Sequence, residues 1–174
     1  MKIRQAQVAD AKAIADIANT IIRDTLITFT TAERNTDSIA EDIRQRDRAY
    51  LVVEDAALVQ GFATYGPFRS GPGYAQCREH SVQLSEQARG KGAGRALMAA
   101  LEEVARHEGV HVLVAGISSA NPGAEAFHAA LGFQHVGRMP EVGYKWGKRL
   151  DLVLMQKILA PKPLVAPDTG VFKG

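Results

Sequence analysis

The sequence predicts a single α/β domain in which a central mixed, mostly antiparallel sheet carries helices on both faces. Strand and helix patterns alternate in the middle of the chain, whereas β-rich runs come in pairs at 50–66 and near the C-terminus. The 174 residues are 46% apolar, which is enough for one well-buried core and little for a second. We expect the domain to span residues 1–159. Residues 160–174 have three prolines and no periodicity, and we expect them to form a loose tail.

The first third of the chain predicts a strand and two helices. A short β-rich run covers residues 3–5, and a helical pattern follows over 8–24. A weaker helical pattern covers 37–47, with Asp37 as a candidate N-cap. The apolar positions that share one face of the longer helix are Ile14, Ile17, Ala18 and Ile21.

The middle of the chain predicts a hairpin, a strand and a long helix. Two β-rich runs within 50–66, separated by polar or small residues at 55–57, indicate the hairpin. The Gly- and Pro-rich loop PFRSGPGYAQ leads to a strand at 78–84. Residues 93–108 form an amphipathic helical pattern that Gly109 is placed to end in a left-handed conformation.

The last third predicts a buried strand, a short helix and two more strands. The apolar run HVLVAGI at 111–117 is typical of a strand covered on both faces. A helix begins near Pro122 and ends at Gly132. Strands at 133–144 and 150–158 complete the pattern.

A glycine loop, EQARGKGAGRAL at 86–97, lies between the 78–84 strand and the long helix. Such a loop can aim successive N–H groups at one anion, while the helix N-terminus supplies about half a positive charge. A Walker A loop needs Ser or Thr after Gly-Lys, but Gly92 follows Lys91. The third glycine of a dinucleotide fingerprint would fall at Arg95 or Leu97, so that register fails too. A surface turn with basic residues is the alternative to an anion site.

The remaining pattern, Arg89-x-x-Gly92-x-Gly94, resembles the pyrophosphate loop of the GNAT superfamily of acyl-CoA-dependent N-acyltransferases. Asn121 after the next strand and the pair Gly132-Phe133 follow in the superfamily's order. The stretches EHSV, GVHVLVAGI, HAALGF and VGYKWGKRLDLVLMQ are similar to phosphinothricin N-acetyltransferases and their methionine-sulfoximine-acetylating relatives. This resemblance runs from about residue 3 to residue 159.

The resemblance implies a GNAT fold, acetyl-CoA as cosubstrate and no metal. Asn121 could hydrogen-bond the amides of the pantetheine arm, although a simple helix N-cap is compatible with the same position. The strand at 78–84 is implied to splay from HVLVAGI and admit that arm like an added strand. The implied cofactor-binding residues are Val82, Gln83, Leu84, Arg89, Gly90, Lys91, Gly92, Ala93, Gly94, Arg95, Asn121 and His128.

The implied reaction is attack of a primary amine on the acetyl thioester, for which the amine must first lose a proton. Glu79 is the carboxylate expected to hold the ammonium and accept that proton, with an ordinary ion pair to Arg78 as the alternative. Backbone N–H groups at 82–84 are the natural donors to the oxyanion. His128 stands where many superfamily members carry Tyr, and is a candidate acid toward the thiolate, a cofactor contact or a packing residue.

The branch acts on small amino acids and their analogues, whose carboxylate calls for an arginine. Arg69 matches the loop arginine of the family and could orient the substrate, with solvent exposure as its alternative. This chain departs from its relatives at Tyr74-Ala75, where an Arg is usual after the aromatic, and at Arg78, where an apolar residue is usual. We therefore expect a re-lined pocket, which leaves the identity of the amine open. The expected substrate residues are Phe29, Arg69, Ser70, Gly71, Tyr74, Arg78, Glu79, His80 and Ser81, of which Phe29 and His80 could instead pack structurally.

Composition narrows the classes of partner. Twenty-one basic against 19 acidic residues leave a net charge of +2, so we expect no nucleic-acid partner. One cysteine fits a reducing cytoplasm, and an apolar run at 110–117 is far below the roughly 18 residues that span a bilayer, so we expect a soluble cytoplasmic enzyme without membrane partners. The resemblance implies a homodimer. The competing functions are protein or peptide N-acetylation and CoA binding without catalysis.

Overall fold

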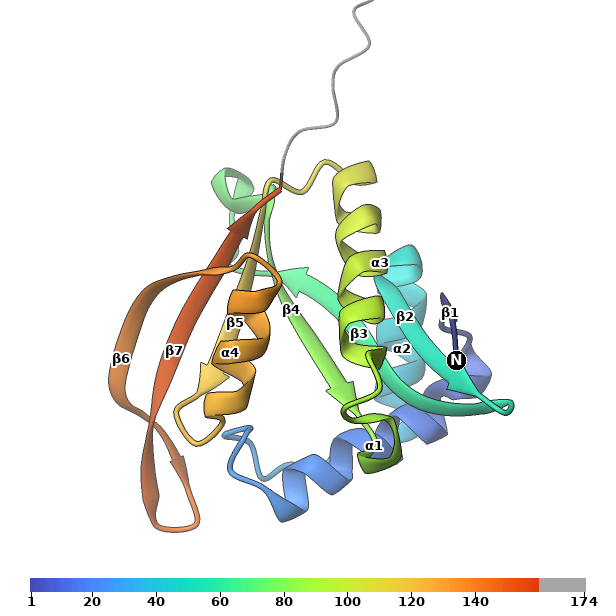
Figure 1. Cartoon of the computed structure of the whole chain (residues 1–174), viewed down its shortest axis with the longest axis horizontal. Helices are drawn as coiled ribbons and strands as arrows, with labels where there is room; N and C mark the ends of the chain where they lie inside the picture. The colour runs from blue at the N-terminus through green and yellow to red at the C-terminus, as the bar shows by residue number, and fades with distance from the viewer. Residues whose placement is uncertain (160–174) are drawn as a thin grey trace, which may run out of the picture.

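A computed structural model describes residues 1–159 as seven strands and four α-helices, with short 3-10 turns between them (Figure 1). The strands are β1 (Lys2–Gln5), β2 (Tyr50–Asp55), β3 (Leu58–Pro67), β4 (Cys77–Leu84), β5 (Val112–Ser118), β6 (Gln134–Lys145) and β7 (Lys148–Ile158). The helices are α1 (Ala11–Asp24), α2 (Thr36–Arg46), α3 (Ala93–His107) and α4 (Pro122–Ala130). The tail predicted at 160–174 lies outside the described residues.

All seven strands belong to one sheet, in the order β1-β2-β3-β4-β5-β7-β6. Neighbouring strands are antiparallel except β4 and β5, which are parallel. The prediction of a mixed, mostly antiparallel sheet is therefore confirmed.

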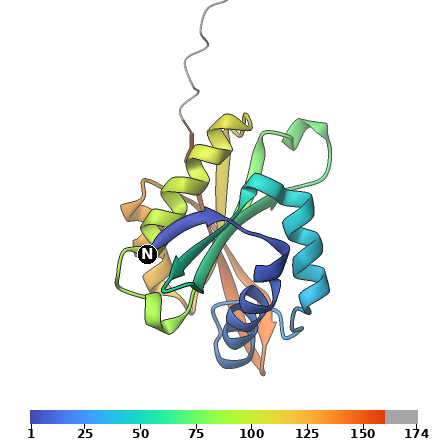
Figure 2. The same cartoon turned by 90° about the vertical axis from the view of Figure 1, so that its right-hand side faces the viewer.

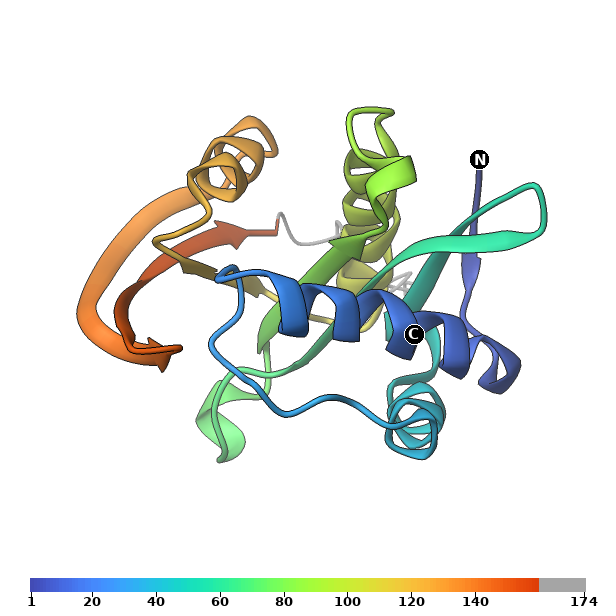
Figure 3. The same ribbon diagram turned by 90° about the horizontal axis from the view of Figure 1, so that it is seen from below.

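Helices cover both faces of this sheet, as Figures 2 and 3 show. On one face α3 buries Leu97 and Leu101 completely, against a core that includes Leu113 of β5 and Val153 of β7. On the other face α1 and α2 bury an Ile-rich surface against β2 and β3. The apolar faces read from the helical spacing are thus the faces that pack on the sheet.

Helix α2 begins one step earlier than its sequence pattern suggested. The side chain of Asn35 accepts a hydrogen bond from the backbone N–H of Ser38 at 2.7 Å, so Asn35 is the N-cap and Asp37 is not. An N-cap side chain reaches the N–H two or three residues ahead, and Asn35 is the residue placed to do so. Asp37 lies in the first turn, where its charge complements the helix dipole.

The predicted splay of β4 from β5 is confirmed. The two strands pair only over 77–79 of β4 and 112–114 of β5. Beyond Glu79 and Val114 both strands continue, but each bonds only to its outer neighbour, β3 or β7. In Figure 1 they diverge toward the end of α1 and the glycine loop. Coverage of β5 on both faces is accordingly incomplete, because Gly116 is exposed in the gap.

Candidate active site

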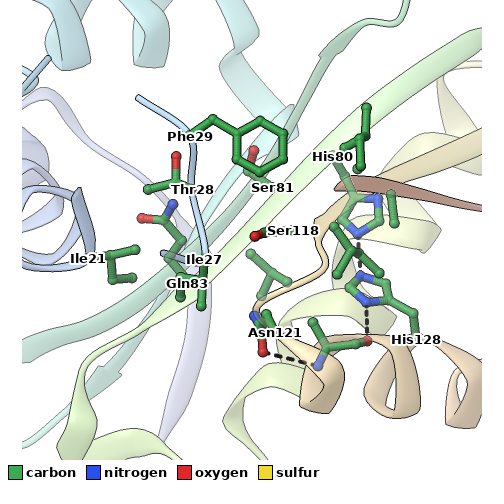
Figure 4. A pocket seen from close by; sticks show the side chains of 16 residues that line it. Ile21, Ile27, Thr28, Phe29, His80, Ser81, Gln83, Ser118, Asn121 and His128 are labelled. Atoms are coloured by element: carbon green, nitrogen blue, oxygen red, sulfur yellow. Dashed lines mark hydrogen bonds between the residues drawn. The ribbon is translucent and has the colours of Figure 1, made fainter. Parts of the chain in front are cut away.

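A cavity of about 280 Å³ lies where β4 and β5 diverge (Figure 4). Its walls come from β4, β5, the start of α4 and the segment that follows α1. Seven predicted site residues line it, from three distant parts of the sequence. They are Phe29, His80, Ser81, Val82, Gln83, Asn121 and His128.

The glycine loop has the backbone conformation that an anion site needs. Gly90 and Gly92 have φ of 73° and 81°, in the left-handed region that favours glycine. Helix α3 starts directly after Gly92, and no side chain caps it, so its first N–H groups are free for a ligand. The side chains of Arg89, Lys91 and Arg95 are exposed around this helix end. A pyrophosphate fits these donors and charges.

Gly94 brings this helix end close to the cavity. A Cβ at Gly94 would lie 3.3 Å from the ring of Phe127, so the missing side chain lets α3 approach α4. Helix α4 carries Asn121 at its N-terminus, where Oδ1 accepts from the N–H of Ala124 at 3.3 Å. Its Nδ2 group makes no hydrogen bond within residues 1–159 and is available at the cavity wall. Capping and ligand binding are thus compatible at Asn121.

Glu79 lies at the point where β4 and β5 part. Its carboxylate extends over Gly116, so close that a Cβ there would lie 2.7 Å from Oε1. The alternative ion pair with Arg78 does not form, and Glu79 has no ion-pair partner in the described part of the chain. Although the residue reaches solvent, partial loss of water raises the pKa of its carboxyl above the ordinary value. A carboxylate with a raised pKa is better matched to accepting a proton near neutral pH.

His80 and His128 form a buried pair in the cavity wall, with 2.9 Å between their Nε2 atoms (Figure 4). The Nδ1 atom of His128 lies 2.7 Å from the carbonyl oxygen of Ala124, which only accepts, so this Nδ1 carries the proton. Nε2 of His128 is then an acceptor, and Nε2–H of His80 donates to it. Burial, and then the neighbouring His128, lower the pKa of His80 to about 3, and burial also lowers that of His128.

This network bears on the roles expected for the two histidines. Neither nitrogen of neutral His128 offers a proton to the cavity, because one donates to Ala124 and the other accepts from His80. Of the expected roles for His128, a cofactor contact or a packing role fits this geometry and an acid does not. His80 packs in the wall with 6% of its surface exposed, as the alternation along the strand suggested.

Six expected substrate residues do not line the cavity. One of them, Glu79, lies at its edge, over the lining residue Gly116. Arg78 alternates with Glu79 along β4 and therefore faces the opposite side of the sheet. Arg69 is exposed, and its guanidinium lies 5.3 Å from the ring centroid of Phe68. Ser70, Gly71 and Tyr74 belong to the same exposed loop. Their contact with a substrate stays a prediction.

Several residues of the cavity wall were not expected from the sequence. Ile27 and Thr28 come from the irregular segment after α1, and Gly116 and Leu152 come from two strands of the sheet. A glycine inside a strand pattern often marks a close approach, and that signal was present in HVLVAGI. Nothing in the sequence around Thr28 or Leu152 indicates that these residues line a cavity.

Within residues 1–159, no group of three or more His, Cys, Asp or Glu side chains is arranged to hold a metal ion. No helix in this range is long and apolar enough to cross a membrane.

The family model described as the Acetyltransferase (GNAT) family matches residues 15–133. The chain belongs to this family. The match includes the splayed strands, the glycine loop and helix α4. With the named relatives below, it makes the chain an acetyl-CoA-dependent N-acetyltransferase with the GNAT fold.

Curated relatives of this GNAT acetyltransferase cover nearly the whole chain. The L-methionine sulfoximine/L-methionine sulfone acetyltransferase of Pseudomonas aeruginosa is 41% identical over 163 residues, which are 91% of this chain and 95% of the relative. The L-amino acid N-acyltransferase MnaT of Escherichia coli is 39% identical over 159 residues, which are 90% and 92% of the two chains.

Solved structures agree with this assignment. The structure of yncA from Salmonella typhimurium with its cofactor acetyl-CoA has a TM-score of 0.88 at 38% identity, covering 97% of this chain and 98% of that one. The ribosomal-protein-alanine N-acetyltransferase of Brucella melitensis has a TM-score of 0.87 at 40% identity, covering 91% of this chain and all of that one.

Proposed function

We propose that this GNAT acetyltransferase moves the acetyl group of acetyl-CoA to the primary amine of a small amino-acid-like substrate of the methionine sulfoximine, methionine sulfone or phosphinothricin type. The observation that carries the proposal is the carboxylate of Glu79, which stands unpaired over Gly116 at the edge of a cavity lined by Phe29 and Ser81. The named relatives support the substrate class.

Successive positions along β4 have different roles in the proposed reaction. Glu79 holds the ammonium group, orients it and takes its proton, directly or through water. Beyond Glu79 the open side of β4 has N–H groups that β5 does not use, and these donate to the oxygen of the reacting acetyl group. Farther along the gap, Asn121 contacts the amides of the cosubstrate, and the glycine loop holds its pyrophosphate.

The reaction balances with these groups alone. The amine nitrogen forms a bond to the thioester carbon, the carbon–sulfur bond breaks, and the thiolate leaves with the bonding electron pair. The first proton lost by the ammonium goes to Glu79 or to water. The second, which the nitrogen loses once it is bound to the acetyl carbon, passes through water to the thiolate. His128 shapes the wall beside the sulfur and contacts it through its ring.

Arg69 is proposed to bind the substrate carboxylate. It is the arginine of the exposed loop between β3 and β4, and its charge is not matched by any ion pair within residues 1–159. A guanidinium binds a carboxylate through two parallel hydrogen bonds, which would fix the amine toward Glu79.

Release of free CoA thiol tests the proposal. The protein is mixed with acetyl-CoA and a panel of methionine sulfoximine, methionine sulfone, phosphinothricin, free amino acids and a peptide with an N-terminal alanine. We expect stimulation by one or more small amino acids and none by the peptide. Stimulation by the peptide alone would replace the small-molecule assignment with protein N-acetylation. Binding of CoA with no stimulation by any amine would leave a binding module.

We also propose a homodimer in the cytoplasm. Strand β6 is one of the two outer edges of the sheet, and such an edge normally needs a cover. Light scattering should give twice the 18.8 kDa of the chain, and Trp146→Glu should shift the protein toward the monomer. The single cysteine suits a reducing compartment. The large apolar side chains that β6 and its turn expose are Val136, Met139, Val142, Tyr144 and Trp146.

A further inference from the structure

Lys145, at the end of β6, is the most completely buried charged side chain in the described part of the chain, with 1% of its surface exposed. Its Nζ donates to the carbonyl oxygens of Ile22, Thr25 and Thr28 at 2.7, 2.8 and 3.1 Å. It takes part in none of the ion pairs found in residues 1–159. Within residues 1–159, its partners are thus three backbone carbonyls and the ring of Trp146, whose centroid lies 4.6 Å from Nζ.

The three backbone carbonyls stabilise the buried positive charge of Lys145. Ile22 lies in the last turn of α1 and Thr25 is its C-cap, so their oxygens carry the partial negative charge of a helix C-terminus. Burial lowers the pKa of Lys145, but only the ammonium form has three N–H groups for three acceptors. The hydrogen bonds therefore favour the charged form that burial opposes.

Lys145 contacts a segment that forms one wall of the cavity. We call residues 25–29 the wall segment; it has no regular secondary structure, and its Ile27, Thr28 and Phe29 line the cavity. Thr28 is both a lining residue and an acceptor of Lys145. The 25–29 stretch runs beside the free end of the β6–β7 hairpin in Figures 1 and 3.

Two more contacts fix the wall segment. The hydroxyl of Ser118 on β5 donates to the carbonyl oxygen of Leu26 at 2.7 Å. The ring of Phe29 lies flat against Gly143 of β6, where a Cβ would approach within 2.7 Å of three ring carbons. A segment without a ladder of its own takes its position from such contacts. Gly143 and Lys145 are the two buried residues of β6 and point to the same side of that strand.

We propose that Lys145 is a positioning residue for the amine pocket: it ties the wall segment to β6 and so sets where Phe29 and Thr28 meet the substrate. This inference rests on the proposed function, because it takes the cavity beside Glu79 as the amine site. The glycine loop that would hold the cosubstrate's pyrophosphate supplies none of the partners of Lys145, so loss of Lys145 should affect binding of the amine and not of the cosubstrate.

The test compares Lys145→Met with Lys148→Met, an exposed lysine on the same hairpin. Methionine keeps the length of the side chain but removes every donor. For Lys145→Met we expect the KM of the amine to rise about ten-fold or more, and the dissociation constant of acetyl-CoA to stay within about two-fold. Amide hydrogen exchange should quicken in the wall segment and be unchanged in α3. Lys148→Met should match the wild type in each measurement.

Each outcome bears on the proposal. The proposal is overturned if Lys145→Met changes the binding of the amine and of acetyl-CoA equally. It is also overturned if the folded variant shows unchanged amide hydrogen exchange at residues 25–29. Should that variant fail to fold, Gly143→Ala presses on Phe29 from the same strand, and an unchanged amine KM there would overturn it. If the wild-type chain acetylates no amine, the proposed function fails, and hydrogen exchange alone decides whether Lys145 fixes the wall segment.

Discussion

The imidazole of His80 donates through Nε2 to Nε2 of His128 across 2.9 Å, in a contact that joins β4 to α4. Burial lowers the pKa of both imidazoles and so favours their neutral forms. The pair therefore closes the cavity wall with two uncharged rings and leaves Glu79 as the titrating group beside the gap. This relationship leads to predictions about stability, pH and turnover.

The free energy of unfolding should fall on acidification because of His80. The pKa of His80 is about 3 in the folded chain and near 6.5 in the unfolded chain. Between these pH values, His80 binds a proton in the unfolded chain but not in the folded chain. The contribution of His80 to the free energy of unfolding is complete above pH 6.5. It is lost as pH falls, at up to about 1.4 kcal/mol per pH unit. Denaturant unfolding from pH 7.5 to 4.5 measures it. His80→Gln should flatten the slope, whereas the exposed control His135→Gln should not.

Replacing His128 should have a modest effect on turnover. General acids contribute about 10² to 10⁴ in rate, but His128 has no proton to give in this geometry. We expect His128→Gln to lower kcat less than about ten-fold. Steady-state kinetics at saturating acetyl-CoA is the measurement, and a loss beyond a hundred-fold would restore the acid role.

Glu79→Gln should abolish most turnover while leaving acetyl-CoA affinity unchanged. Loss of a general base costs about 10² or more in kcat. Because the pKa of Glu79 is raised, kcat/KM of the wild type should decline on the acid side at a pH above that of an ordinary glutamate. That acid limb should vanish in the variant. Isothermal titration with CoA checks affinity, and a collapse of binding would contradict the assignment.

Gly116→Ala should displace the Glu79 carboxylate, because the new Cβ would lie 2.7 Å from Oε1. We expect kcat/KM for the amine to fall about ten-fold or more. Gly137→Ala is the control, since nothing lies within 4 Å of a Cβ there. If the effect acts through the carboxylate, the double variant with Glu79→Gln should be no worse than Glu79→Gln alone.

Gly92→Ala should weaken acetyl-CoA binding. Its φ of 81° costs a residue with a side chain about 1–2 kcal/mol, so the loop either strains or changes shape. Thermal unfolding and CoA titration should both report the change. Gly73→Ala, in an open position of the β3–β4 loop, should alter neither.

The sequence was most informative where local pattern and chain order determine the structure. The strand order along the chain, the faces of α1 and α3, the left-handed Gly109 and the end of the short helix before Gly132 follow from periodicity and glycine placement, and the structure has them. The resemblance supplied what periodicity lacks, namely that β4 and β5 part beside Asn121.

The sequence was less informative about how residues from distant segments lie relative to one another. The loop with Arg69 has no periodicity, so nothing in its sequence fixes which way it faces. Arg78 was expected at the substrate, but strand alternation puts it on the opposite side from Glu79. Lys145 reads as an ordinary surface lysine near a turn, because its acceptors are backbone carbonyls 117 to 123 residues away. No side-chain pattern encodes such a contact.

The divergence of β4 and β5 gives this sheet two interior edges in addition to its outer ones. Exposed edges invite other chains to pair with them and aggregate. Here helix α4 and the wall segment line the cavity between these inner edges. An extended ligand with amide groups of its own can pair with such an edge. We expect the arm of the cosubstrate to do so, and thereby to occupy backbone groups that would otherwise be open to another chain.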